Sequence, residues 1–166
     1  MLRTRGFTLI ELVTMMIIIG IISVFALGRL DFTTVFEQRG VQDKVKAALQ
    51  FARRAAVAER RYICVAVAGG VITLKRDTRV PETTPATFCD GSAASNLDLP
   101  GPDRTCSPAA SNAVCSSTHA TITSTAAAIV FDPQGHSTAG AVATVTVPGQ
   151  PSGVTVTVEG TTGYVH

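Results

Sequence analysis

The chain lacks the sequence patterns of the common catalytic and metal-binding sites. None of its three histidines, His119, His136 and His166, belongs to an H-x-x-x-H or H-E-x-x-H pattern, and no G-x-S-x-G elbow is present. The Gly69-Gly70 pair lacks the lysine and the helix context of a phosphate-binding loop. No two cysteines have C-x-x-C spacing. These absences predict a chain that is not an enzyme and that uses no cofactor or metal ion.

Proline is also missing from residues 1–80, since Pro81 is the first one. No proline therefore forbids a single long helix from about Phe7 to Arg61, which would measure about 80 Å. Gly28 is one of its weak points, because glycine destabilises a helix interior by about 1 kcal/mol relative to alanine.

A length of 166 residues predicts one domain with an extension. The formal net charge of +2 indicates no partner by itself, but the charges are unevenly distributed. Residues 39–61 hold seven basic and two acidic residues, whereas residues 77–166 hold seven acidic and two basic ones. The sequence therefore predicts a basic stem followed by an acidic head.

Four cysteines follow the apolar N-terminal segment: Cys64, Cys89, Cys106 and Cys115. An even number of cysteines among Ser, Thr, Gly and Pro is typical of two disulfides formed in an oxidising compartment. Of the three possible connectivities we favour Cys64–Cys89 with Cys106–Cys115, because each bridge closes a local loop.

Residues 12–27 are almost continuously apolar, and with residues 7–10 the run is long enough to span a membrane as a helix. Glu11 interrupts it, although a carboxylate inside a spanning helix costs about 2.5–3.5 kcal/mol. A secretory signal peptide cleaved at residues 26–28 would explain the basic start but not Glu11. A permanent signal anchor would leave Glu11 near the cytoplasmic surface.

Residues 6–12, Gly-Phe-Thr-Leu-Ile-Glu-Leu, resemble the cleavage and assembly motif of type IV pilins and type II secretion pseudopilins. The resemblance implies that prepilin peptidase cuts between Gly6 and Phe7 and methylates the new amine of Phe7. Residues 1–6 would be the leader, and residues 7–30 a helix that first spans the bacterial inner membrane and later joins the filament core. Glu11 would pair with the amine of Phe7, in its own or a neighbouring subunit, and so offset the burial of its charge.

The remaining sequence predicts a stem and a head. Residues 31–61 form an amphipathic helix, because apolar residues recur at helical spacing: Val41, Val45, Ala48, Leu49, Ala52 and Ala56. Its basic residues are typical of a solvated face, and no aromatic residue stands directly beside Lys44, Lys46, Arg53, Arg54 or Arg60 in the sequence to stack on single-stranded nucleic acid. The head, residues 62–166, lies in the periplasm if the resemblance holds.

Within the head, residues 62–68 and 71–76 predict a β-hairpin, with Gly69-Gly70 as its turn. Residues 77–125 show no periodicity and predict an irregular, disulfide-bearing insertion with at most short strands. Further strands are expected at 128–131, 142–147 and 154–158, and a last short one at 164–165. The predicted fold is α+β, with a long N-terminal helix packed on an antiparallel sheet.

This order of elements resembles the GspH/FimT-like branch of minor pilins and pseudopilins, whose partners are other pilins. DNA-binding members of the branch end in a Gly-Arg-x-Arg motif, whereas this chain has Gly163-Tyr164-Val165-His166. Tyrosine and a neutral histidine do not replace the phosphate and base contacts of arginine. The alternative function, DNA uptake, is therefore disfavoured.

The C-terminal residues and the cysteine-bearing insertion look more like those of the minor pilins of mannose-sensitive haemagglutinin-type pili.

Overall fold

The computed structural model describes residues 7–27, 32–79, 94–138, 141–146 and 153–166. Its contacts divide the chain into two compact units, residues 1–33 and residues 34–166. The first unit contains helix α1, Leu9–Leu27, and the second contains almost all of helix α2, Phe32–Glu59, together with every strand. Residues 28–31 lie outside the described residues, so the continuity of one long helix through Gly28 stays a prediction.

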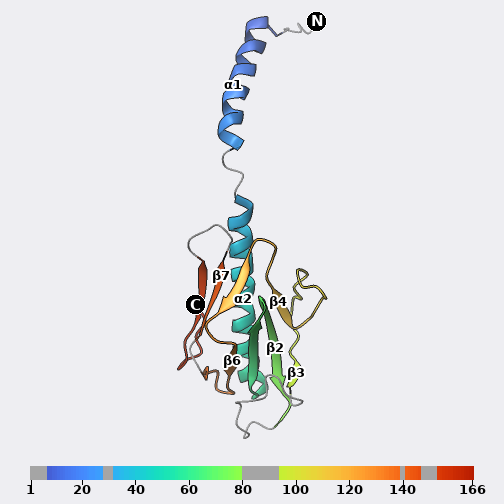
Figure 1. Ribbon diagram of the computed structural model, residues 1–166, viewed down its shortest axis with the longest axis vertical. Coiled ribbons are helices and arrows are strands. Elements are labelled where there is room, and N and C mark those ends of the chain that lie inside the picture. Colours follow the sequence, from blue (N-terminus) through green and yellow to red (C-terminus); the bar gives the residue numbers. More distant parts are fainter. Residues whose placement is uncertain (1–6, 28–31, 80–93, 139–140, 147–152) are drawn as a thin grey trace, which may run out of the picture. The chain divides into compact units, whose positions relative to one another are not determined.

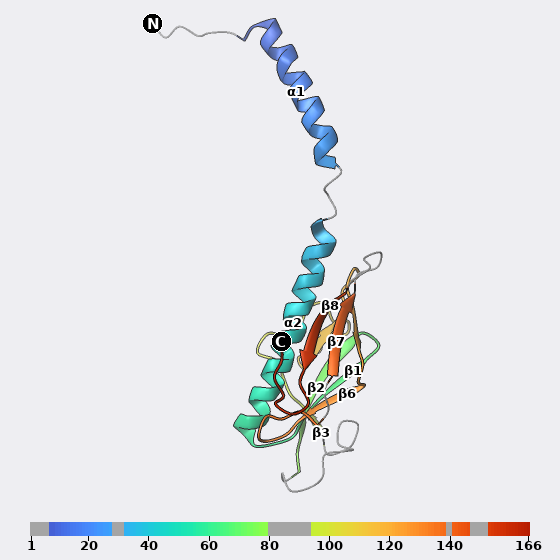
Figure 2. The ribbon, with the colours of Figure 1, turned by 90° about the vertical axis from the view of Figure 1, so that its left-hand side faces the viewer.

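Helix α2 buries the predicted apolar stripe. All six predicted positions are buried, with Val45, Leu49, Ala52 and Ala56 fully inaccessible to solvent. The helix ends in a Schellman arrangement: the Arg61 amide donates to the Ala56 carbonyl at 3.2 Å, and Arg60 takes a left-handed φ of 52°. Strands cover this face of α2 in both ribbon views (Figures 1 and 2).

The first sheet is built on the predicted hairpin. Strands β1, Ile63–Ala68, and β2, Val71–Asp77, pair antiparallel with Ala68 opposite Val71. Gly69 and Gly70 have φ values of 58° and 78°, and positive φ at both central residues characterises the type I′ turn that twists a hairpin correctly. Strand β6, Ala128–Phe131, pairs with the other edge of β1.

Two short strands from the predicted insertion complete this sheet. Strands β3, Ala94–Asn96, and β4, Ala113–Cys115, pair with consecutive parts of β2. Of the predicted insertion, the structure describes residues 77–79 and 94–125, and strands β3 and β4 within it are each three residues long. That part nevertheless contributes buried side chains to the core, Leu97, Val114 and Ile122 among them.

The second sheet has the order β5-β7-β8, formed by Thr121–Ser124, Ala141–Thr146 and Val154–Val158. The last two agree with the predicted strands to within one residue. The predicted final strand is reduced to an isolated bridge between Val158 and Val165. The α+β prediction, a helix packed on antiparallel sheets, is confirmed, with residues from α2 and both sheets sharing one core.

One buried carboxylate, Asp103, joins α2 to the insertion. Its side chain is 3% exposed and accepts a hydrogen bond from Lys44 Nζ at 2.8 Å. The backbone amides of Thr105 and Cys115 donate to its two oxygens, each at 3.1 Å. The disulfide Cys106–Cys115 closes the same loop, so the salt bridge and the covalent bond hold one segment against the helix.

The predicted pairing of Cys106 with Cys115 is present in the structure. Cys64, fully buried in β1, is also disulfide-bonded. The predicted partner of Cys64 is Cys89, which lies outside the described residues, so that pairing stays a prediction.

The surroundings of Asp103 favour its charged form. Burial alone would raise the pKa, but the Lys44 ammonium and the two amides outweigh burial and lower the pKa from 3.8 to about 2. Because the folded-state pKa is depressed, the stabilisation is fully present above pH 4 and is lost as the pH falls towards 2. The shift corresponds to about 2 kcal/mol.

We predict that Asp103→Asn lowers the free energy of unfolding of residues 34–166 by about 2 kcal/mol at pH 7. The difference from wild type should shrink between pH 4 and pH 2, because protonation removes the same charge. Urea unfolding followed by circular dichroism measures both effects. The control is Asp43→Asn, an exposed carboxylate on α2. A difference between Asp103→Asn and wild type that stays constant down to pH 2 would contradict the account.

Candidate functional site

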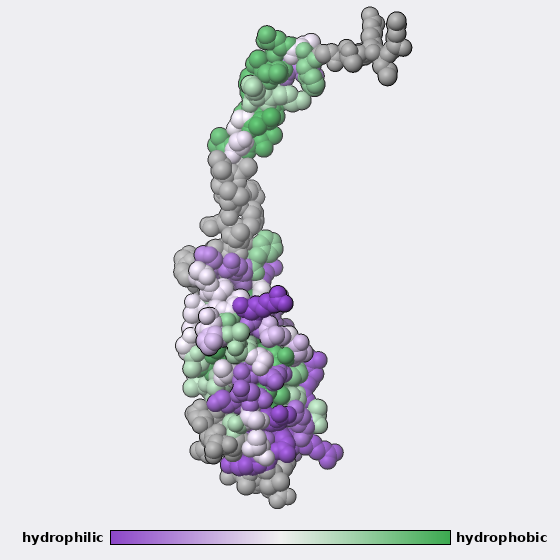
Figure 3. All heavy atoms as spheres, turned by 90° about the vertical axis from the view of Figure 1, so that its right-hand side faces the viewer, coloured by the Kyte–Doolittle hydropathy of each residue, from purple (hydrophilic) through white to green (hydrophobic). Residues whose placement is uncertain are grey.

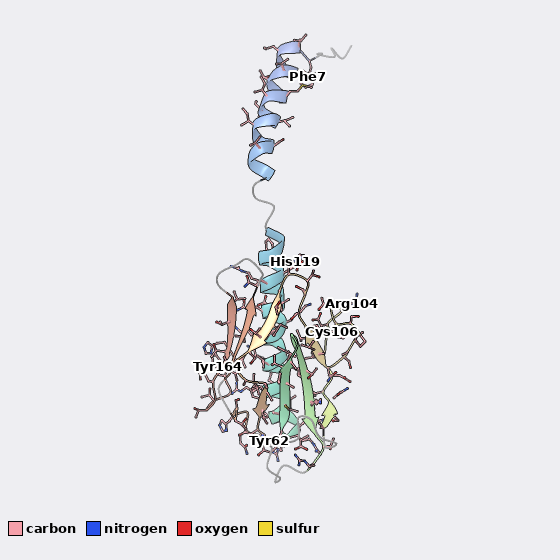
Figure 4. All side chains as sticks on the ribbon, in the orientation of Figure 1. Phe7, Tyr62, Arg104, Cys106, His119 and Tyr164 are labelled. Carbon is pink, nitrogen blue, oxygen red and sulfur yellow. A yellow bond between two sulfur atoms is a disulfide. The ribbon has the colours of Figure 1, made fainter. Side chains whose placement is uncertain are left out.

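The predicted processing and assembly residues lie at the start of α1. Gly6 lies outside the described residues, and Phe7, 76% exposed, lies two residues before the first residue of the helix (Figure 4). The Glu11 amide donates to Thr8 Oγ1 at 3.4 Å, and the Leu12 amide donates to the Thr8 carbonyl at 3.2 Å. Thr8 is therefore the N-cap of α1, and Glu11 stands in its first turn.

The capping role of Thr8 is not among the expectations drawn from the sequence. The signal was present as Thr-x-x-Glu before an apolar run, which is the capping-box pattern. A carboxylate in the first turn also interacts favourably with the positive end of the helix dipole. Glu11 thus has a local stabilising role besides the assembly role that the resemblance implies.

Apolar side chains cover most of the face of α1 that Figure 3 shows. Its exposed large hydrophobic residues are Leu9, Ile10, Leu12, Val13, Met15, Met16, Ile17, Ile18, Ile19, Ile21, Ile22 and Val24. Two hydroxyl groups do not interrupt this surface, because Thr14 donates to the Glu11 carbonyl at 2.9 Å and Ser23 to the Ile19 carbonyl at 2.7 Å. A helix that is apolar all round requires an apolar environment.

No helix in the part of the chain that the structure describes is both long enough and apolar enough to cross a membrane.

Several basic residues of the stem are bound by the head rather than fully solvated, contrary to the expected solvated face. Lys44 pairs with Asp103, and Arg53 Nε donates to the Gly135 carbonyl at 3.0 Å. Arg61 Nη1 donates to the carbonyls of Asp77 and Arg79, at 3.2 and 2.9 Å. These cations therefore fasten α2 to loops of the head.

Asp77, at the end of β2, is the second buried carboxylate with a perturbed pKa. Burial would raise its pKa, but hydrogen bonds from Arg79 and the charges of Arg79 and Arg61 outweigh that effect and lower it. Arg79 binds through two nitrogens, Nε to Oδ1 at 3.1 Å and Nη2 to Oδ2 at 3.0 Å. The arrangement fixes the chain where it leaves the first sheet, and it is structural.

The C-terminal residues fold back onto α2. The rings of Tyr164 and His166 stack with their centroids 5.5 Å apart, and Tyr164 shares a shallow hollow with Arg54. Gly163 lies against the Gly135 carbonyl, where a Cβ atom would collide with the oxygen. The structure therefore places aromatic rings beside basic residues of the stem, which their separation in the sequence did not reveal.

Among the described residues, no group of three histidine, cysteine, aspartate or glutamate side chains could hold a metal ion. Each of the three histidines has different surroundings. His136 Nδ1 lies 3.2 Å from Asp132 Oδ2, His166 stacks on Tyr164, and His119 is exposed.

Comparison with solved structures gives relatives of one kind. The type IV minor pilin FimU of Pseudomonas aeruginosa PAO1 has a TM-score of 0.56 at 17% identity, over 81% of this chain and 90% of FimU. The minor pseudopilin EpsH from the Type 2 Secretion System of Vibrio cholerae has a TM-score of 0.56 at 10% identity, over 78% of this chain and 94% of EpsH. At these identities the likeness shows the fold.

No curated protein sequence matches the chain. The family described as Type II transport protein GspH matches residues 42–162, well over half of the length. That match begins inside α2 and runs through both sheets, so it covers most of the stem and nearly all of the head. Members of this family are structural proteins, which confirms the prediction that the chain is not an enzyme. The chain belongs to the GspH family of type II secretion pseudopilins and type IV minor pilins.

Proposed function

We propose that prepilin peptidase cuts this chain after Gly6 and that the product is built into a type IV pilus or a type II secretion pseudopilus. The observation that carries the proposal is the surface of α1, which is apolar on every side. Burying one large apolar side chain contributes about 1.5–3 kcal/mol. A bundle of such helices from several subunits would bury all sides of α1 at once, and the core of the head contains none of the described residues of α1.

Residues 7–30 would first hold the chain in the bacterial inner membrane, with the head in the periplasm. The disulfide between Cys106 and Cys115 fits that oxidising compartment. Cleavage creates a cationic amine on Phe7, one helical turn before Glu11. In a filament the Glu11 carboxylate pairs with the Phe7 amine of a neighbouring subunit, so neither charge is buried alone.

We predict that Gly6→Val blocks cleavage, because a β-branched side chain at the residue before the cut crowds the bond that the peptidase attacks. The full chain would then stay in the membrane at its uncleaved mass. Gly20→Val is the matched control, since a side chain there meets nothing within 4 Å, and it should be cleaved normally. Electrophoresis of membrane fractions reads out both variants. Normal cleavage of Gly6→Val would overturn the assignment of the processing site.

Glu11→Ala should be cleaved normally and yet enter filaments at a level at least about tenfold lower, because the Phe7 amine would be buried unpaired. Glu11→Gln should show the same defect, since it keeps the size and loses the charge. Thr14→Ala, one turn further along α1, should assemble normally. The amount of chain in sheared filaments, relative to membranes, measures assembly. Wild-type levels for Glu11→Ala would refute the pairing.

DNA binding for uptake is the second candidate, favoured by the stack of Tyr164 on His166 beside Arg54. Stacked rings next to a cation resemble the platforms that bind single strands. The cations here are already engaged: Arg53 Nε donates to the Gly135 carbonyl and Arg54 Nε to the Gln50 carbonyl at 3.3 Å. DNA would have to compete with these carbonyl groups for the two arginines, so assembly is the better-supported function.

We therefore expect no shifted band when residues 34–166 are mixed with single- or double-stranded DNA at physiological salt. Non-specific contacts, if present, should vanish with modest added salt. Arg54→Ala removes a cation that lines the hollow beside Tyr164, whereas Arg39→Ala removes an exposed cation elsewhere on α2. Comparing the two variants distinguishes DNA binding at the hollow from non-specific binding to basic residues. A band that persists at physiological salt and disappears only with Arg54→Ala would establish the second candidate instead.

A further inference from the structure

An apolar groove runs along α2 beside the loop that carries Asp103. It encloses about 510 Å³ between the helix, at Ala47 and Phe51, and the loop, at Leu99 and Pro100. A neighbouring hollow of about 530 Å³ shares three of these residues and extends the groove along the helix to Ala58. The small alanines on one wall leave room for a bulky side chain from outside.

The rim of this groove is basic. Lys44 stands on the helix side, and its side chain is 43% exposed even though it pairs with Asp103. Arg104 stands on the loop side and is exposed at the margin of the head (Figure 4). Across the described part of the chain no hydrogen bond or ion pair of the Arg104 side chain is found. An apolar floor with a cationic rim fits an apolar side chain that has a carboxylate beside it.

The same helix carries such a pair of residues. Phe36 is 71% exposed, and Glu37 next to it is exposed as well. At about 100° per residue, Phe36 lies within about 60° of Ala47 and Phe51 around the helix axis, on the side turned away from the buried stripe. It also lies about 20 Å from the groove along the axis, so it cannot reach the groove of its own chain.

We propose that the groove is the docking site for Phe36 and Glu37 of a second copy of this chain. Phe36 enters between Phe51 and Leu99, and the Glu37 carboxylate faces Lys44 and Arg104. The contact joins two different surfaces, so each pair of copies leaves one groove and one Phe36 free, and the contact propagates along a filament. The inference rests on the proposed assembly function and specifies one lateral contact within it.

Site-specific photocrosslinking in the full chain tests the contact. The chain, with p-benzoylphenylalanine in place of Phe36, is produced in bacterial membranes and irradiated. The expected product is a dimer whose crosslink maps by mass spectrometry to residues 99–105 of the second copy. The same probe in place of Val57, exposed on α2 outside the groove, should not label residues 99–105. Crosslinks from position 36 only to lipid, to another protein or to another part of a second copy would overturn the proposal.

A probe in place of Ile17, in α1, separates this proposal from the assembly function. Dimers through position 17 without groove crosslinks from position 36 would reject the groove and leave assembly through α1 intact. Absence of dimers from both positions would reject both proposals.

Charge reversal adds a second, independent readout. Glu37→Lys and Arg104→Glu should each lower the yield of the groove crosslink by about two- to fivefold, the range for exposed ion pairs. The two substitutions together should restore the yield, because the pair is re-formed with its signs exchanged. Glu37→Lys combined with Lys46→Glu, on α2 outside the groove, should not. Equal yields for all variants would show that Glu37 does not face the groove rim.

Discussion

The burial of one face of α2 is the constraint on which the head depends. Its apolar stripe lies against two separate sheets, and residues from the helix and from both sheets form one core. Each sheet is small, with short strands, and gains its stability from packing against the helix. One face of α2 is therefore part of the core of the head.

Hydrogen bonds and a salt bridge hold the loops of the head against α2. Asp103 binds Lys44 of α2 and two amides of the disulfide loop, while Arg53 and Arg61 bind carbonyl groups on other loops. Lys44 of the stem thus binds an acidic residue of the head, and Arg53 and Arg61 bind carbonyl groups of the head. A stem cation that is used in this way has fewer hydrogen-bond donors free for an external polyanion such as DNA.

The features that could be predicted from the sequence are those set by local patterns. The helical spacing of the α2 stripe, the Gly-Gly turn and the Val-Thr alternation of β8 each specify their element over a few residues. Strands β3 and β4 are only three residues long, which is too short for a periodic signal. They form because they pair with strand β2, which lies far from them in the sequence. The Asp103–Lys44 pair spans 59 positions and has no local signature. Thr8, by contrast, was identifiable from its capping-box spacing.

The two helices differ in how their apolar residues are exposed. Helix α2 buries its apolar stripe in the core of the head, whereas α1 exposes its large apolar residues from Leu9 to Val24 and so requires apolar partners. The most direct test of this account is the intact mass of the chain recovered from sheared filaments. We expect a chain of residues 7–166 bearing one methyl group on the Phe7 amine. A chain that starts at Arg29 or Asp31, or one that never appears in the filament fraction, would contradict the account.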